Sequence, residues 1–223
     1  MLVFRMTVFA VSWLTLVAQY LLMVTGPSDR GLIMSTLNFF GYFTILTVLS
    51  VALAMTVAMI QIVRARGIWT ERPGPAIDAL VRFFARPAVR AGIGLNILVV
   101  CVVYNSVLAP IHNPTGLGAL TNDSLHTLIP VLYLVDWVLY SDKSGMRYED
   151  LAFWIIYPVA YGVFLILRGL AFGNFVYPFL DINDLGAVAV AVNMVALGLA
   201  YAIGAVAFIS FGRLGWGASR PSD

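Results

Sequence analysis

Charged residues are scarce in this chain: Asp, Glu, Lys and Arg make up 11% of its 223 residues, against about 25% in soluble globular domains. Cysteine occurs once, at Cys101, so an internal disulfide is excluded. The 13 basic and 11 acidic residues nearly balance and form no long basic block, which argues against a nucleic-acid-binding protein. These shortages exclude a soluble domain, a disulfide scaffold and a nucleic-acid binder.

Several motifs of well-known enzyme classes are also missing. The sequence has no G-x-S-x-G, H-E-x-x-H or C-x-x-C motif and no Gly-rich phosphate-binding loop. Its two histidines are His112 and His126, and His112 lies in a Pro- and Gly-rich segment that is unsuited to form a haem site with His126. No Cys, His or acidic residues have the spacing of a metal site. We therefore expect neither a metal nor an organic cofactor.

Long apolar stretches dominate the chain instead. Apolar residues make up 61% of it, and the mean hydropathy is +0.92. A membrane-spanning helix needs about 20 mainly apolar residues, whereas strands of a membrane barrel alternate over about 10. The sequence predicts an all-α membrane protein, a single domain of residues 1–223 folded as a bundle of six transmembrane helices. The predicted spans cover residues 6–25, 37–63, 92–109, 124–140, 151–167 and 185–210.

The basic residues lie mainly on one side of these predicted spans. If the N-terminus is cytoplasmic, two of them, Arg30 and Arg168, are outside. Because cytoplasmic loops carry the excess of Lys and Arg, we expect both termini to be cytoplasmic. The basic residues placed inside are Arg5, Arg64, Arg66, Arg72, Arg82, Arg86, Arg90, Lys143, Arg147, Arg213 and Arg220.

The longest predicted cytoplasmic connection, from Arg64 to Arg90, contains a periodic segment. Apolar residues share one helix face there, while Asp78, Arg82 and Arg86 recur at intervals of four on another. One interpretation is an amphipathic helix whose basic face meets anionic lipid headgroups. The other is an early start of the third span. Both stay open at the level of the sequence.

Few polar side chains fall within the predicted spans. Ionisable groups at membrane depth cost about 2.5–3.5 kcal/mol on insertion scales, so each is a functional candidate. Thr44 is expected about 10 Å along the second span and His126 about 3 Å along the fourth. The alternative for each is structural, since a membrane Thr commonly bonds the carbonyl one turn back. The functional candidates among the polar residues of the spans are Thr44, Thr47, Asn96, Asn105, His126, Asp136 and Asn193.

Two carboxylates of the fourth span have different expected roles. Asp123, one turn before His126, is expected either to cap the span or to orient the imidazole. Asp136 lies about 15 Å further along the helix, which is too far to orient that imidazole. We expect Asp136 to be solvated or paired with Asn96.

Several short strings spread along the chain are distinctive. The longer ones are Tyr42-Phe43-Thr44-Ile45, Asn122-Asp123-Ser124-Leu125-His126-Thr127 with Pro130, and Val176-Tyr177-Pro178-Phe179-Leu180-Asp181. The shorter ones are Asp136-Trp137, Tyr157-Pro158 and Arg168-Gly169. Through these strings the chain resembles the androgen-induced membrane proteins and their bacterial relatives, from the first span to the sixth.

The resemblance implies an integral-membrane hydrolase that cleaves fatty acid esters of hydroxy fatty acids, with Thr44 as nucleophile and His126 as base. It also implies the bacterial cytoplasmic membrane as the location, with membrane lipids or fatty acid esters as substrate. The animal members have one more residue between this His and the following Pro. Their Thr also precedes a carboxylate-containing stretch that this chain lacks, so the departures concern the substrate more than the catalytic pair.

Further residues on the predicted outer side complete the expected site. Asn105, near the outer end of the third span, is a candidate oxyanion donor. Arg168 is a candidate for binding a fatty acid carboxylate, with snorkelling to the surface or pairing with Asp181 as its structural alternatives. Tyr177 belongs to the string before the sixth span and is a further candidate for substrate binding.

A second class of function fits the same composition. A non-catalytic lipid-binding, receptor-like or transport protein would use His126 only to hydrogen-bond a lipid headgroup. A transport path would be lined by Asn96, Asp136 and Asn193. A hydrolase instead requires the Thr44 hydroxyl within hydrogen-bonding reach of a His126 nitrogen.

Overall fold

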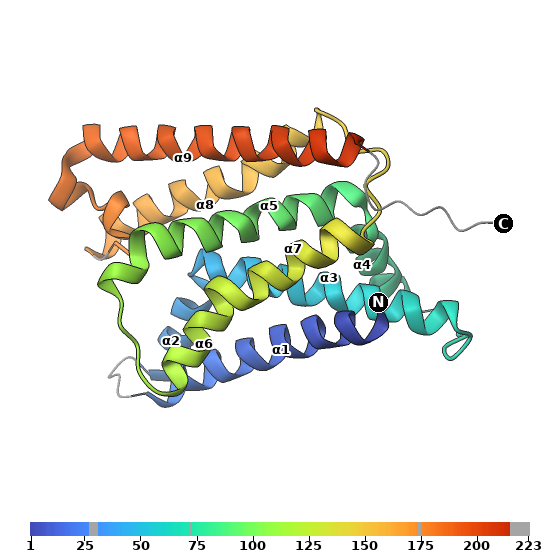
Figure 1. Ribbon diagram of the computed structural model, residues 1–223. Helices are drawn as coiled ribbons and strands as arrows, with labels where there is room; N and C mark the ends of the chain where they lie inside the picture. The colour runs from blue at the N-terminus through green and yellow to red at the C-terminus, as the bar shows by residue number, and fades with distance from the viewer. Residues whose placement is uncertain (27–30, 72, 174, 215–223) are drawn as a thin grey trace. The chain divides into compact units, whose positions relative to one another are not determined.

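The computed structural model describes residues 1–26, 31–71, 73–173 and 175–214, and these residues are helical with no strand among them (Figure 1). They belong to two compact units, Met1–Ser144 and Gly145–Leu214, and each unit is described by itself. The predicted sidedness of Arg30, Arg72 and Arg220 falls on residues outside the described ranges.

The first unit is built from helices that run along one another (Figure 1). Its helices are α1 (Leu2–Thr25), α2 (Gly31–Phe40), α3 (Phe43–Ala65), α4 (Pro75–Ala85), α5 (Pro87–Val103), η1 (Tyr104–Leu108), η2 (Ala109–Ile111), α6 (Leu117–Asp123), η3 (Ser124–Leu128) and α7 (Ile129–Tyr140). Here η1 and η3 are π-helical turns and η2 is a 3₁₀ turn. The α6, η3 and α7 segments follow one another without a gap, so they make one helical run.

The second unit consists of α8 (Asp150–Phe172), η4 (Pro178–Leu180) and α9 (Ile182–Arg213). Asp181 caps α9 by accepting hydrogen bonds from the backbone N–H groups of Asn183 and Asp184. Gly186, with φ of +77°, then breaks the regular helix, a conformation that glycine adopts without a Cβ clash. Asn193 Nδ2 donates to the carbonyl oxygen of Phe179 at 2.8 Å and ties α9 to η4.

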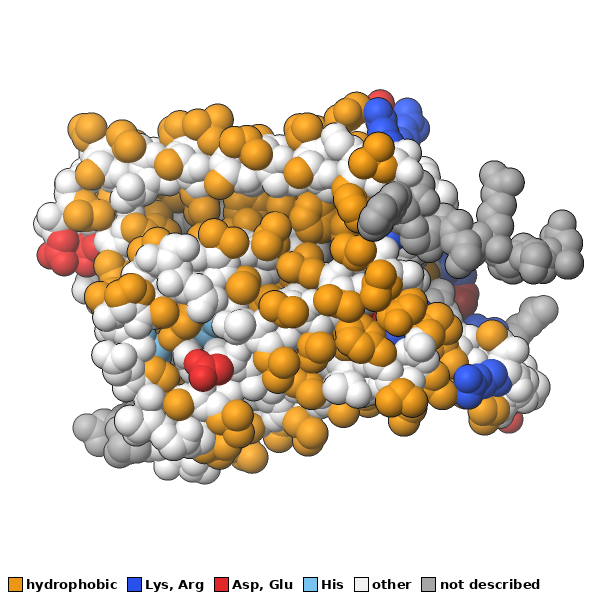
Figure 2. All heavy atoms as spheres, viewed as in Figure 1, with side chains coloured by type: hydrophobic (Ala, Val, Ile, Leu, Met, Phe, Trp, Pro, Cys, Tyr) orange, Lys and Arg blue, Asp and Glu red, His pale blue; other side chains and the backbone are white. Residues whose placement is uncertain are grey.

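Among the described residues, five helices are long and apolar enough to cross a membrane. Figure 2 shows hydrophobic side chains along the lengths of the helices, with few charged ones between them. The all-helical class and the long apolar helices are therefore as predicted. The five helices are Leu2–Thr25, Phe43–Ala65, Pro87–Ile111, Asp150–Phe172 and Ile182–Arg213.

The predicted second span, residues 37–63, is divided in the structure. The helix α2 ends at Phe40, and α3 begins at Phe43 after an extended Tyr42 (φ −91°, ψ 130°). Gly41 stands at the break, and glycine is among the weakest helix formers. Thr44 therefore lies in the first turn of α3, and the expected depth of about 10 Å along a continuous helix is wrong.

The predicted fourth span, residues 124–140, begins earlier than expected. Gly116, with φ of +57°, turns the chain into α6, which starts at Leu117. Asp123 is then the last residue of α6 and is followed directly by η3. The expectation that Asp123 caps the start of a helix is therefore wrong.

The segment between the second and third spans forms a separate helix, α4. Arg86 is extended (φ −64°, ψ 131°) and separates α4 from α5, because a residue before proline avoids the helical region. The interpretation as an early start of the third span is therefore excluded. Val81 and Phe84 are buried, whereas Ile77 and Leu80 are exposed. The contact of α4 with lipid headgroups stays a prediction.

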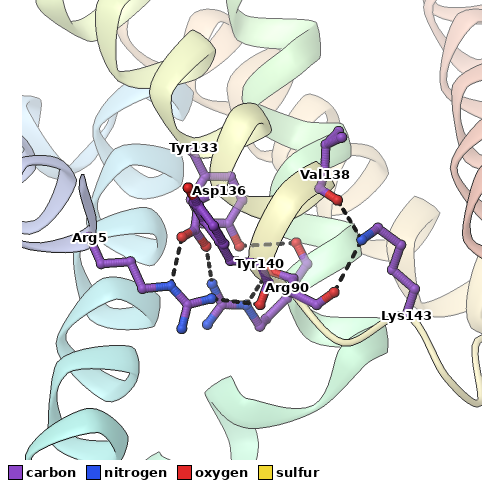
Figure 3. Close-up of polar contacts among 8 residues, drawn as sticks. Arg5, Arg90, Tyr133, Asp136, Val138, Tyr140 and Lys143 are labelled. Carbon is purple, nitrogen blue, oxygen red and sulfur yellow. Dashed lines mark hydrogen bonds and ion pairs between the residues drawn. The ribbon is translucent and has the colours of Figure 1, made fainter. Parts of the chain in front are cut away.

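A buried ion cluster joins α1, α5 and the end of α7 (Figure 3). Both oxygens of Asp136, which is fully buried, are engaged: Arg5 Nε donates to Oδ1 at 2.7 Å and Arg90 Nη2 donates to Oδ2 at 2.7 Å. Arg5 also donates to the carbonyl oxygen of Tyr140 at 2.8 Å, and Arg90 Nε donates to Ser141 Oγ at 3.1 Å. The expectation of a solvated or Asn-paired Asp136 is wrong.

The side chains of Tyr133 and Lys143 make further hydrogen bonds beside this cluster (Figure 3). The Tyr133 hydroxyl donates to the carbonyl oxygen of Arg90 at 3.0 Å. Lys143 Nζ donates to the carbonyl oxygens of Val138 and Ser141 at 2.8 and 3.1 Å, and burial lowers the pKa of this ammonium. These bonds hold the segment after α7 against the cluster.

Replacing Asp136 is expected to destabilise the first unit strongly. In Asp136→Asn the two guanidinium groups lose their shared anion, and breaking a buried ion pair costs about 3–5 kcal/mol. Asp78→Asn in α4 is the matched control, because the Asp78–Arg82 pair is exposed and such pairs contribute about 0–1 kcal/mol. Thermal unfolding of the detergent-purified protein measures the difference. Equal losses in the two variants would contradict a stabilising role of the cluster.

Candidate functional site

The structure brings Thr44 and His126 together. Thr44 Oγ1 lies 3.4 Å from His126 Nε2, and the two residues come from the first turn of α3 and from the π-helical turn η3. Both side chains are partly buried. A contact of 3.4 Å is longer than the usual 2.6–3.2 Å for a nucleophile and its base, a separation that commonly shortens when substrate binds.

The other ring nitrogen of His126 fixes its tautomer. Nδ1 lies 2.9 Å from the carbonyl oxygen of Asn122, which can only accept a hydrogen bond. Nδ1 therefore carries the proton in the neutral imidazole. This leaves the Nε2 lone pair toward the Thr44 hydroxyl, which is the arrangement that a general base requires.

This contact also corrects the expected role of Asp123. The imidazole is oriented by the main-chain carbonyl of Asn122 and not by the Asp123 carboxylate. Asp123 is exposed, and its Oδ1 accepts from Asn122 Nδ2 at 3.3 Å. Its negative charge lies near the site, but its side chain does not hold the ring.

Tyr104 stacks on the imidazole ring. The centroids of the Tyr104 and His126 rings are 3.6 Å apart and their planes differ by 15°. Tyr104 is buried, with 7% of its surface exposed. It begins the π-helical turn η1, and η1 contacts η3, which carries His126. Single π-helical turns occur frequently at functional sites.

Asn105, the candidate oxyanion donor, is near the site but its amide is already used. Nδ2 donates to the carbonyl oxygens of Cys101 and His126 at 2.8 and 3.3 Å, and it lies 3.3 Å from Thr127 Oγ1. Asn105 thus connects η1 to the backbone of η3. The predicted oxyanion role is replaced by a structural one.

The start of α3 supplies other donors beside the nucleophile. The first turn of a helix leaves its N–H groups without intrahelical acceptors. In α3 the first intrahelical bond runs from the Leu46 N–H to the carbonyl oxygen of Tyr42 at 3.2 Å, so the N–H groups of Thr44 and Ile45 precede it. These groups, together with the positive end of the helix dipole, favour a negative charge next to Thr44.

The remaining predicted residues belong to the second unit. Arg168 lies in α8 and is partly buried, and Tyr177 precedes η4, where its ring stacks on Phe179 with centroids 5.3 Å apart. Asp181 acts as the N-cap of α9, which gives it a structural role of its own. The substrate-binding roles of Arg168, Tyr177 and Asp181 stay predictions.

In the described residues, no group of three or more His, Cys, Asp or Glu side chains is placed to hold a metal ion. Thr44, His126 and the start of α3 offer a hydroxyl, an imidazole and backbone donors. These are the components of nucleophilic acyl transfer.

No protein-family model, no curated protein and no solved structure matches this chain. Membership of the androgen-induced membrane proteins stays a prediction from the resemblance. The geometry at Thr44 and His126 stands independently of that resemblance.

Sequence reasoning missed two residues of the site, Tyr104 and Asn122. Asn122 acts through its main-chain carbonyl, which no side-chain motif can reveal. Tyr104 precedes Asn105 and gives no periodic or motif signal. The one available indication was its position directly before Asn105, which the sequence places near the outer end of the third span.

The tautomer of His126 can be tested directly. In the variant His112→Gln, His126 is the remaining histidine of the chain. Side-chain ¹⁵N NMR of this variant in detergent is expected to show a protonated Nδ1 and an unprotonated Nε2, because the Asn122 carbonyl accepts only from an N–H. A dominant Nε2–H form would contradict the hydrogen bond that orients the base.

Proposed function

We propose that this protein is an integral-membrane hydrolase of lipid esters in which Thr44 is the nucleophile and His126 the general base. The observation that carries the proposal is the 3.4 Å approach of Thr44 Oγ1 to a His126 nitrogen whose partner Nδ1 is bonded to a main-chain carbonyl. The resemblance supports fatty acid esters, including those of hydroxy fatty acids, as the substrate class.

The reaction proceeds in two acyl-transfer steps. His126 Nε2 takes the Thr44 proton as Oγ1 attacks the ester carbonyl carbon, and a tetrahedral oxyanion forms. The oxyanion collapses, the ester C–O bond breaks, and the imidazolium returns the proton to the departing alkoxide. Water then attacks the Thr44 acyl ester with His126 again as base, which releases the fatty acid and restores the hydroxyl.

The N-terminus of α3 is the proposed source of oxyanion stabilisation. The backbone N–H groups of Thr44 and Ile45 belong to the same helical turn as Thr44 Oγ1, the attacking oxygen. Donors beside the attacking oxygen can stabilise the oxyanion that forms there. They replace Asn105, whose amide holds the backbone of His126. The donors are part of the main chain, so their arrangement does not depend on a side-chain rotamer.

The proposed membrane placement has six spans. The helical run of α6, η3 and α7 extends over 24 residues, from Leu117 to Tyr140. A helix of about 20 residues spans a bilayer. Together with the five long helices it would complete the predicted six. The excess of Arg and Lys on the predicted cytoplasmic side, including Arg64, Arg66 and Arg82, supports cytoplasmic termini. The bacterial cytoplasmic membrane is supported by the resemblance.

In this placement the nucleophile lies at the outer end of α3, and the base lies midway along its span. Thr44 is the second residue of α3 and Arg64 the one before its last, while His126 is the tenth residue of the run from Leu117 to Tyr140. His126 lies about 15 Å along the helix from Asp136 in the ion cluster. A lipid ester in the outer leaflet would then reach the pair laterally, without passing through water.

The contacts of Asp136 argue against the alternative function, a transport path. That path would need Asp136 open to a solute, but its carboxylate is fully buried and bonded to Arg5 and Arg90. Asn193, a second residue of that path, donates to the Phe179 carbonyl. The hydrolase is therefore the function that the contacts favour.

Removal of the Thr44 hydroxyl or the His126 imidazole should abolish hydrolysis. Thr44→Ala and His126→Gln are expected to lower kcat at least about 100-fold on a p-nitrophenyl ester of a long-chain fatty acid, since general-base catalysis contributes about 10²–10⁴-fold. A fluorophosphonate probe, which phosphonylates activated hydroxyls with loss of fluoride, should label the parent protein and not Thr44→Ala.

Thr47 provides the matched control. It lies one turn after Thr44 on α3, is 1% exposed, and its Oγ1 has no hydrogen-bond partner in the described part of the chain. Thr47→Val therefore keeps the shape of the side chain and removes no hydrogen bond. This variant should retain the parental kcat and the parental labelling by the probe. Parental turnover in both Thr44→Ala and His126→Gln would exclude the proposed mechanism, and loss of labelling in Thr47→Val alone would move the nucleophile to Thr47.

A further inference from the structure

Tyr104 makes the closest ring contact with the proposed base. The two ring centroids are 3.6 Å apart with planes 15° from parallel, so one face of the imidazole is covered by the phenol ring. Tyr104 is itself buried and cannot leave this position without opening the end of α5. The stack thus restricts rotation of the imidazole about its bond to the Cβ atom.

Two π-helical turns create this stack. In η1 the Ala109 N–H bonds to the carbonyl oxygen of Tyr104, and in η3 the Ile129 N–H bonds to that of Ser124, so each turn has a five-residue spacing. A π-helical turn inserts one residue and rotates all following side chains relative to an α-helix. The two turns face each other, which places Tyr104 over His126.

The backbone of His126 is held from the same turn. Asn105 Nδ2 donates to the His126 carbonyl oxygen at 3.3 Å and to the Cys101 carbonyl at 2.8 Å. The Asn122 carbonyl fixes Nδ1 at 2.9 Å. With the ring face, the ring nitrogen and the main chain all constrained, the remaining nitrogen Nε2 points to Thr44 Oγ1.

We propose that Tyr104 is a positioning residue of the hydrolase, whose ring holds the His126 imidazole in the plane that directs Nε2 at Thr44. The inference rests on the proposed function for its kinetic consequence, but the stack itself can be measured without turnover. The ring supplies the effect, and its hydroxyl does not, because a parallel stack is a contact between ring faces.

Tyr104→Phe and Tyr104→Leu separate these contributions. Phenylalanine keeps the ring and loses the hydroxyl, so Tyr104→Phe should retain kcat within about twofold. Leucine keeps apolar bulk and loses the plane, so Tyr104→Leu should lower kcat about 10- to 100-fold, as expected when a catalytic group is misplaced by about 1 Å. KM should stay within about twofold in both, because Tyr104 acts through His126 and not on the substrate.

The stack has an NMR signature that does not depend on activity. In the His112→Gln background, the His126 ring protons should be shifted upfield, because they lie over the face of an aromatic ring. Tyr104→Phe should keep this shift and Tyr104→Leu should lose it. Thermal unfolding of each variant identifies any that fails to fold, and Tyr104→Met then replaces Tyr104→Leu as the ring-free variant.

The possible results distinguish the two proposals. Loss of the ring shift in Tyr104→Leu with a lower kcat and unchanged KM supports the positioning role. An unchanged ring shift, or an unchanged kcat where Thr44→Ala is inactive, overturns the role of Tyr104 and leaves the hydrolase intact. Parental turnover in Thr44→Ala and His126→Gln overturns the hydrolase and the positioning role together, whatever the ring shift shows.

Discussion

One buried carboxylate constrains the first unit. Asp136 binds guanidinium groups from the starts of α1 and α5, so three helices must bring these ends together before the ion cluster can close. Among the described residues, Arg5 and Arg90 both pair with Asp136, and an unpaired buried charge is costly. Apolar packing along the helices allows sliding, whereas the cluster has a single arrangement. The cluster therefore fixes the register of α1, α5 and α7.

The same helices carry the candidate site at their other ends. The helix α5 begins beside Arg90 and continues into η1 with Tyr104, and α7 continues back through η3 to His126. These two helices are joined by the Arg90–Asp136 ion pair (Figure 3). They are also joined by the Tyr104–His126 stack. A shift of α5 by one residue would break both contacts. The ion cluster and the orientation of the base are thus linked through the rigidity of two helices.

Hydropathy was sufficient for the helical class and for most of the apolar helices, since these depend on composition averaged over many residues. It placed α3 too early, because the break at Gly41 is a local effect inside an apolar stretch. The partner of Asp136 was missed for a different reason. Arg5 and Arg90 were predicted as cytoplasmic charges and Asp136 as solvated or paired with Asn96, but the long arginine side chains reach this carboxylate.

The site could be predicted only as far as side-chain chemistry allows. The pairing of Thr44 with His126 was predicted through the resemblance and the residue types, while the expected depth of Thr44 was wrong because of the break before α3. Neither π-helical turn has a sequence signature, so the Tyr104 stack was outside the reach of the sequence. The carbonyl of Asn122 belongs to the main chain, and its use depends entirely on how His126 rotates.

The group that accepts the hydrogen bond from His126 Nδ1 has a chemical consequence. In the Ser-His-Asp arrangement a buried carboxylate stabilises the imidazolium that forms during attack. Here a neutral carbonyl orients Nδ1, and the nearby Asp123 carboxylate is exposed and not bonded to the ring. A carbonyl fixes the tautomer as firmly as a carboxylate but stabilises the cation less. In the proposed hydrolase, more of the rate must then come from orientation of the base and from the donors at the start of α3, which is why the constraints on the His126 ring matter for the proposal.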